Sequence, residues 1–116
     1  MGGFRMPEFK MPYMPSPSER YQEDVIEKLR AIERGLPAEH ELQISAYVGG
    51  EHIRVQRLQF TDSAVVVAHG IDESENATYI MSTSFALELI CKVVKIKPET
   101  RRSTIGFDVP SKTSHE

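Results

Sequence analysis

The sequence predicts a mainly β domain with one N-terminal helix, folded as a small, strongly bent, five-stranded antiparallel barrel with an extra strand near the C-terminus. Three observations predict it: one stretch of helical apolar period, a change to a period of two after it, and a shift of phase inside the second strand. The chain has 116 residues, 40% apolar and 27% charged, with a formal net charge of -3. This size and composition fit one globular domain, neither a disordered acidic chain nor a strongly basic nucleic-acid binder.

The helix has a well-marked start and end. Ser16 fits the N-cap, Pro17 the first helical position, and Glu19 completes a capping box three residues after the cap. Gly35 and Pro37 end the helix. The apolar stripe expected to face the core consists of Tyr21, Val25, Leu29, Ile32 and Leu36.

The first strand follows, because the apolar residues then alternate with polar or small ones until Gly49-Gly50, which predicts a tight hairpin turn. Its apolar members are Leu42, Ile44, Ala46 and Val48.

The second strand changes phase. Ile53 and Val55 occupy odd positions, whereas Leu58 and Phe60 occupy even ones. Both pairs can face one core only if a bulge or sharp bend lies near Gln56-Arg57. This bend is the reason for predicting a small barrel rather than a flat sheet.

The remaining strands are shorter. Residues 64–68 are apolar on both faces, so we expect the helix to cover the outer side of this third strand. Residues 72–76 form a polar hairpin loop, and a fourth strand begins at 78–81. Residues 84–96 fit a turn and a long strand, which we favour, or a short helix capped by Ser84. A late strand, which needs a sheet edge of this chain or of another subunit, is indicated by Ile105, Phe107 and Val109.

Residues 1–17 form an arm in front of a domain spanning 18–109, and residues 110–116 are expected to be a disordered tail. The arm repeats the pattern aromatic, cation, Met, Pro, and proline at this density favours extended or polyproline II backbone. Two alternatives stay open: an unstructured arm, or an arm that docks onto this protein, a neighbouring subunit or a partner. The side chains that would make such a contact are Phe4, Met6, Phe9, Met11 and Tyr13.

Several classes of protein are disfavoured by the sequence. The longest apolar run, residues 64–68, is far shorter than the ~20 residues that cross a bilayer, and no secretory signal is evident, so a cytoplasmic protein is expected. Cys91 lies in an apolar run and is predicted to be a buried small hydrophobe. The four histidines lack metal-ligand spacing, and neither a phosphate loop nor a nucleophile elbow occurs. We therefore expect no catalysis, no metal and no cofactor.

Positive charge gathers near the C-terminal end. Between residues 92 and 102 five cations are opposed only by Glu99, and Arg54 and Arg57 lie on the polar side of the second strand. Such cations could line an anionic site, or they could simply be solubilising charges on strand ends and a loop. The residues predicted to bind a ligand are Arg54, Arg57, Lys95, Arg101 and Arg102 for phosphate and Tyr79 for base stacking.

The segment from Tyr21 to Ile96 resembles the bacterial Sm-like RNA chaperones in its layout, with a glycine turn at Gly49-Gly50, a long second strand ending in Phe60 and a Tyr-containing fourth strand. Residues 20–109 are also similar to a bacterial family of uncharacterised small proteins. The sequence segments that show this similarity are Glu39-His40-Glu41, residues 64–70 and Arg101-Arg102-Ser103-Thr104-Ile105-Gly106-Phe107.

The Sm-like resemblance implies a ring oligomer made by strand pairing between subunits, with ligands on a face or rim. The chain departs from that pattern at three places: Val55 replaces a glycine, Thr61 an acidic residue, and Tyr79-Ile80-Met81-Ser82 a basic or asparagine-bearing motif. No uridine-binding residues carry over, so the resemblance supports the fold more than the function.

Three functions follow as hypotheses. The first is a non-enzymatic, oligomeric binding module for RNA or a nucleotide-type anion. The second is a protein-interaction or assembly factor that acts through the arm. The third is sequestration of a cyclic nucleotide immune signal, by analogy with small proteins of bacterial and phage immunity.

Overall fold

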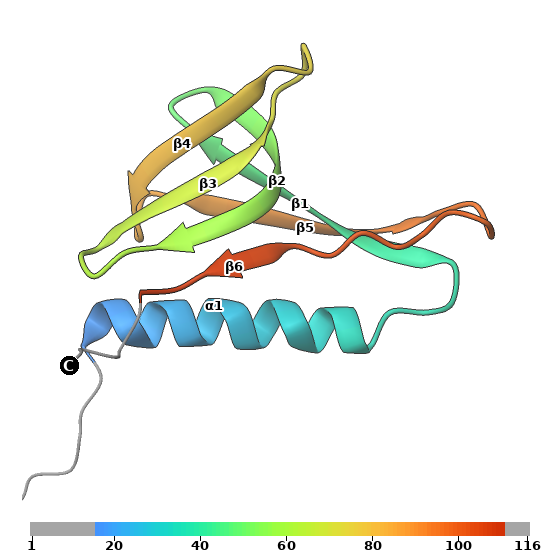
Figure 1. The fold of residues 1–116 in the computed structure, drawn as a ribbon, viewed down its shortest axis with the longest axis horizontal. Coiled ribbons are helices and arrows are strands. Elements are labelled where there is room, and N and C mark those ends of the chain that lie inside the picture. Colours follow the sequence, from blue (N-terminus) through green and yellow to red (C-terminus); the bar gives the residue numbers. More distant parts are fainter. Residues whose placement is uncertain (1–15, 111–116) are drawn as a thin grey trace, which may run out of the picture.

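The computed structural model describes residues 16–110, and it confirms a mainly β domain with one N-terminal helix (Figure 1). Residues 1–15 of the predicted arm and 111–116 of the predicted tail lie outside the described residues, whereas Ser16 and Pro17, at the end of the predicted arm, begin α1. The elements are α1 (Pro17–Arg34), β1 (His40–Val48), β2 (Glu51–Phe60), β3 (Val65–Ile71), β4 (Ala77–Thr83), β5 (Glu88–Lys95) and β6 (Gly106–Asp108).

Helix α1 begins and ends where predicted. The Ser16 hydroxyl accepts a hydrogen bond from the Glu19 N–H at 3.2 Å, and the Glu19 carboxylate accepts one from the Ser16 N–H at 3.0 Å. Gly35 is the C-cap. The predicted stripe is confirmed except at Ile32, which is 38% exposed; Gln22 and Ile26, which were not predicted, also face the core. Gln22 and Ile26 also have helical spacing, so only the packing partner decides which positions face the core.

Five strands form one antiparallel sheet in the order β4-β3-β2-β1-β5, strongly bent along β2 (Figure 1). Within residues 16–110, no ladder joins β4 to β5, so the sheet is not closed into a barrel. Residues 84–96 form a turn and then β5, as favoured from the alternation. Gly49 and Gly50 both have positive φ in the tight turn between β1 and β2.

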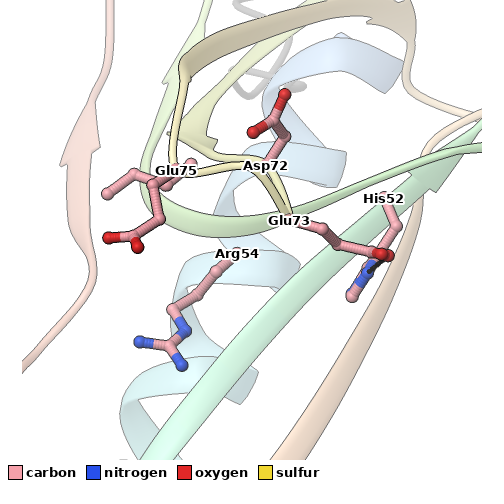
Figure 2. A pocket seen from close by; sticks show the side chains of 6 residues that line it. His52, Arg54, Asp72, Glu73 and Glu75 are labelled. Atoms are coloured by element: carbon pink, nitrogen blue, oxygen red, sulfur yellow. Dashed lines mark hydrogen bonds and ion pairs between the residues drawn. The ribbon is translucent and has the colours of Figure 1, made fainter.

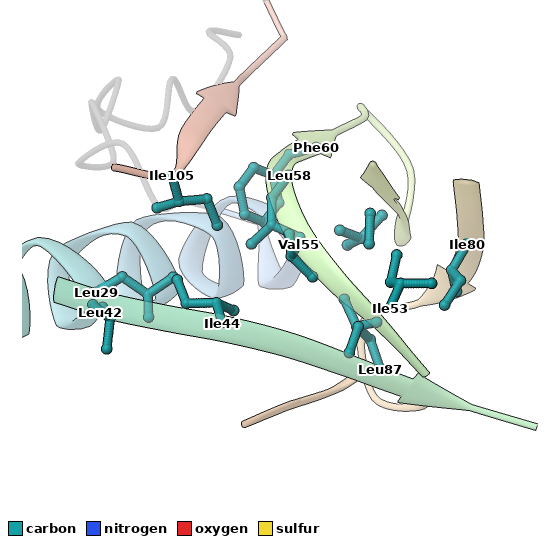
Figure 3. Close-up of a cluster of buried hydrophobic side chains, with 13 residues drawn as sticks. Leu29, Leu42, Ile44, Ile53, Val55, Leu58, Phe60, Ile80, Leu87 and Ile105 are labelled. Carbon is teal, nitrogen blue, oxygen red and sulfur yellow. The ribbon is translucent and has the colours of Figure 1, made fainter. Parts of the chain in front are cut away.

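The predicted bulge in β2 is confirmed. The register with β3 shifts between Val55 and Arg57. As a result the apolar side chains before and after the bulge all enter the same core, including Ile53 and Phe60 (Figure 3). Opposite Val55 stands Gly70, where a Cβ atom would collide with the Arg54 carbonyl oxygen. The bent strands approach too closely here for any side chain on β3.

Strand β6 forms, and the unpaired strand side that it needs is supplied by β2 of the same chain. It pairs in parallel with β2, with Arg57 opposite Gly106 and Gln59 opposite Asp108. The reason is that β1 pairs only with the first part of β2, up to the pair Ser45–Arg54. The same side of the second part of β2 is therefore free, and β6 pairs there. The late strand therefore uses its own chain and needs no edge from another subunit.

Helix α1 covers the concave side of the sheet rather than the outer side of β3. Tyr21 contacts Phe60 edge to face, with ring centroids 6.2 Å apart, and Arg30 lies 4.5 Å over the ring of Phe107. Leu29 is buried in the same core (Figure 3). The prediction that α1 covers the outer side of β3 is therefore wrong, and Val65 remains 37% exposed there.

Cys91 is exposed, contrary to prediction. It lies on β5, an edge strand whose apolar residues are largely uncovered. Partial burial still raises the pKa of its thiol. Among the described residues, no helix is both long and apolar enough to cross a membrane.

Candidate functional site

The outward side of β2, β3 and β4 forms a continuous surface, which we call the outer face. Its side chains alternate with the buried ones of the same strands, and the register aligns them in cross-strand rows. The outer face consists of Arg57, Gln59, Val65, Val67, His69, Tyr79 and Met81.

One row of the outer face combines a cation with two aromatic rings. Arg57 stands opposite His69, and His69 opposite Tyr79. The rings of His69 and Tyr79 meet nearly at right angles with centroids 4.8 Å apart. His69 Nε2 is hydrogen-bonded to the Gln59 side-chain oxygen at 3.1 Å, which fixes the imidazole. Tyr79 remains 61% exposed, so this row presents a free aromatic face to solvent.

The cation of this row is paired with a carboxylate. Arg57 Nη2 donates to Asp108 Oδ1 at 2.7 Å, and Nε donates to the other carboxylate oxygen. These hydrogen bonds lower the pKa of Asp108 and raise the pKa of Arg57, so both groups stay charged near neutral pH. Both side chains are partly exposed, so the guanidinium can exchange Asp108 for a ligand oxygen at little cost.

Arg54, also predicted to bind phosphate, lies in a different environment. It lines an open cavity of about 360 Å³ together with acidic residues of the loop between β3 and β4 (Figure 2). His52 Nδ1 lies 3.4 Å from Glu73 in this cavity and stacks on Tyr47, with ring centroids 4.5 Å apart. Asp72 and Glu75 complete the acidic lining, which repels phosphate and disfavours Arg54 as an anion site.

The other three predicted cations lie around the start of β1. Lys95 stands opposite His40 in the β1–β5 ladder, and Arg102 donates to the carbonyl oxygens of His40 at 2.7 Å and Pro37 at 3.1 Å. The Arg102 guanidinium therefore holds the C-terminal segment onto the connection between α1 and β1. Arg101 is exposed beside it. The structure thus distributes the six predicted ligand-binding residues over three places, and it puts the predicted stacking residue Tyr79 in one row with a single predicted cation, Arg57.

Sequence reasoning missed the side chains that accompany this pair. His69 was considered only for metal-ligand spacing, and Gln59 and Asp108 were not singled out. His69 follows Val67 by two positions, so the alternation of β3 could have placed its side chain on the outer face. Asp108 lies beside this row only because β6 pairs with β2, and no local pattern indicates that pairing. Within residues 16–110, no group of three or more His, Cys, Asp or Glu side chains could hold a metal ion. The predicted partner-binding residues Phe4, Met6, Phe9, Met11 and Tyr13 lie outside the described residues.

Comparison of this chain with protein-family models, with curated proteins and with solved structures gave no match. Its function is therefore inferred from its own geometry.

Proposed function

We propose that this protein is a non-enzymatic, oligomeric binding module for single-stranded RNA or another nucleotide-type ligand, which it holds on the outer face. The observation that carries the proposal is the row formed by Arg57, His69 and Tyr79. An exposed aromatic ring on a sheet surface stacks on a base, and a neighbouring guanidinium binds the phosphate.

The Arg57–Asp108 pair gives this face a moderate rather than a strong affinity for phosphate. A ligand phosphate must replace the Asp108 carboxylate on the guanidinium. The base contact at Tyr79 requires no such exchange, because the ring is exposed. Stacking should therefore contribute most of the affinity, and phosphate contacts should contribute a shallow dependence on salt.

Self-association is the second part of the proposal. Within residues 16–110, strands β4 and β5 each pair on one side only, and exposed apolar side chains lie on both of them. Pairing of β4 from one subunit with β5 of the next would satisfy both edges, which is the ring arrangement that the Sm-like resemblance implies. The outer face would then be repeated in every subunit, which raises the avidity for a chain of nucleotides.

The test measures binding of a fluorescein-labelled single-stranded RNA 12-mer by anisotropy. Tyr79→Ala should weaken binding about 5- to 150-fold, which corresponds to the ~1–3 kcal/mol of one stacked base. Tyr47→Ala is the matched control, because Tyr47 is also exposed but stacks on His52, away from the outer face. Equal effects of the two substitutions would reject the outer face as the binding site.

A second arm of the test separates ligand classes. Lys95→Glu with Arg101→Glu should change RNA affinity less than Tyr79→Ala does, because these cations lie at the start of β1, away from the outer face. Competition by a cyclic dinucleotide but not by RNA would instead support sequestration of a cyclic nucleotide signal.

A further inference from the structure

One end of the outer face is apolar and uncovered. Val65 is 37% exposed and Met81 73% exposed, and Phe85, just beyond β4, is 86% exposed. Val65 stands opposite Thr83, which lies two residues from Met81 and two from Phe85, and a group of exposed apolar side chains marks a contact surface. Within residues 16–110, α1 packs on the concave side of the sheet and leaves these three side chains exposed. We call these three residues the apolar end.

The chain enters the described structure beside the apolar end. Ser18, in the first turn of α1, lines one small cavity together with Val65 and Ser84. Ser84 directly follows β4 and precedes Phe85. Residues 1–15 join α1 through Ser16, so this segment is tethered where the exposed apolar side chains begin.

The sequence of this segment carries a stripe with a period of three. Polyproline II backbone repeats every three residues, so positions three apart share one side. Four consecutive positions of one such side are apolar, namely Met6, Phe9, Pro12 and Pro15. Grooves and faces lined by aromatic residues are the usual docking surfaces for such segments, and the ring of Phe85 is exposed here.

Addition of this segment to β4 as a further strand is disfavoured. In a strand, N–H groups face the partner at alternate positions, so two positions five apart point in opposite directions. Pro7 and Pro12 are five apart, and one of them would have to face the ladder without an N–H to donate. A side-chain contact on the outer face has no such requirement.

We propose that residues 6–15 dock in polyproline II conformation on the apolar end of the outer face of their own chain. Ten residues at ~3.1 Å each span ~31 Å, which exceeds the ~23 Å of the seven residues of β4. The segment is thus long enough to run from Ser16 over Phe85 and Met81. The inference does not depend on RNA binding, since the docked segment and the ligand would occupy adjoining parts of the face.

Paramagnetic relaxation tests this docking in the full chain. A nitroxide is attached at Gly3→Cys in a Cys91→Ser background, and amide signals of the ¹⁵N-labelled protein are recorded without RNA. We expect amides of β4 and Phe85 to lose most of their intensity. A result in which these amides keep their intensity would overturn the proposal. Broadening seen only when spin-labelled and ¹⁵N-labelled molecules are mixed would also overturn it, in favour of docking on a second copy.

Two composition-matched variants of the spin-labelled protein test the stripe. Met6→Ser with Phe9→Ser removes one Met and one Phe from the stripe and should restore at least half of the lost intensity. Phe4→Ser with Met11→Ser removes the same residue types from other sides and should leave the broadening unchanged. Equal effects of both variants would contradict docking through this side of the segment.

Discussion

Asp72 illustrates how a single side chain closes a loop. Its Oδ1 accepts the N–H groups of Ser74 and Asn76, both at 2.9 Å, at the start of the polar hairpin between β3 and β4. The bond from Asn76 is the main reason why the pKa of Asp72 is lowered. The loop was predicted from its polar residues, and this carboxylate is the physical reason for its conformation.

The pH dependence of stability tests this contact. Because the pKa of Asp72 is lower in the folded state, its contribution is complete above the unfolded value of about 3.9 and is lost as pH falls through the folded value. Asp72→Asn keeps an acceptor oxygen but does not titrate. We therefore expect this variant to lose less stability than the wild type between pH 6 and pH 2.5, measured by urea unfolding.

Asp72→Ala provides the contrast. It removes the acceptor as well as the charge, so it should lower stability at both pH values. If Asp72→Asn showed the full acid sensitivity of the wild type, the role given to this carboxylate would be wrong.

At the scale of elements, the bulge of β2 and the glycine of β3 depend on each other. The bulge turns the second half of β2 so that both halves serve one core, and it brings the Arg54 carbonyl against Gly70. Gly70 stands directly opposite Val55 in the β2–β3 ladder, at the residue before the register shifts.

Gly70→Ala should therefore destabilise the fold by at least about 2 kcal/mol in urea unfolding, because the new Cβ meets backbone that cannot move alone. Gly106→Ala is the control: a Cβ there meets the Arg57 side chain rather than backbone and should cost clearly less. A loss at Gly70 no larger than the loss at Gly106 would show that the two strands can separate.

At the scale of the whole molecule, the open edges of β4 and β5 in the described part of the chain are where copies could pair. Ile90 and Val93 are exposed on the edge strand β5. Apolar side chains on a free edge favour association with another copy. Ile90→Lys with Val93→Lys should convert an edge-paired oligomer into smaller species, measured by sedimentation velocity. Val109→Lys changes an equally exposed apolar residue beyond β6, outside the six strands, and should leave the oligomer intact. A monomeric wild type would refute edge pairing outright.

The elements were predictable because their signals are local. The capping box around Ser16, the glycine turn at Gly49-Gly50 and the phase shift near Gln56-Arg57 each involve residues close in sequence, and the structure confirms all three. The candidate site was predictable only in part. Arg57 and Tyr79 were named for their chemistry, but their proximity depends on the registers of two separate ladders.

The sequence by itself determined which segments are helix and strand, where the second strand bends, and that the third strand is apolar on both sides, because these properties follow from local periodicity. Only the tertiary structure decided that α1 takes the concave side, that β6 pairs with β2, and that Cys91 and the apolar end stay exposed. Each of these depends on which surfaces meet across long sequence separations, and several pairings bury similar apolar area. The free energies of packing, rather than any local pattern, select among them.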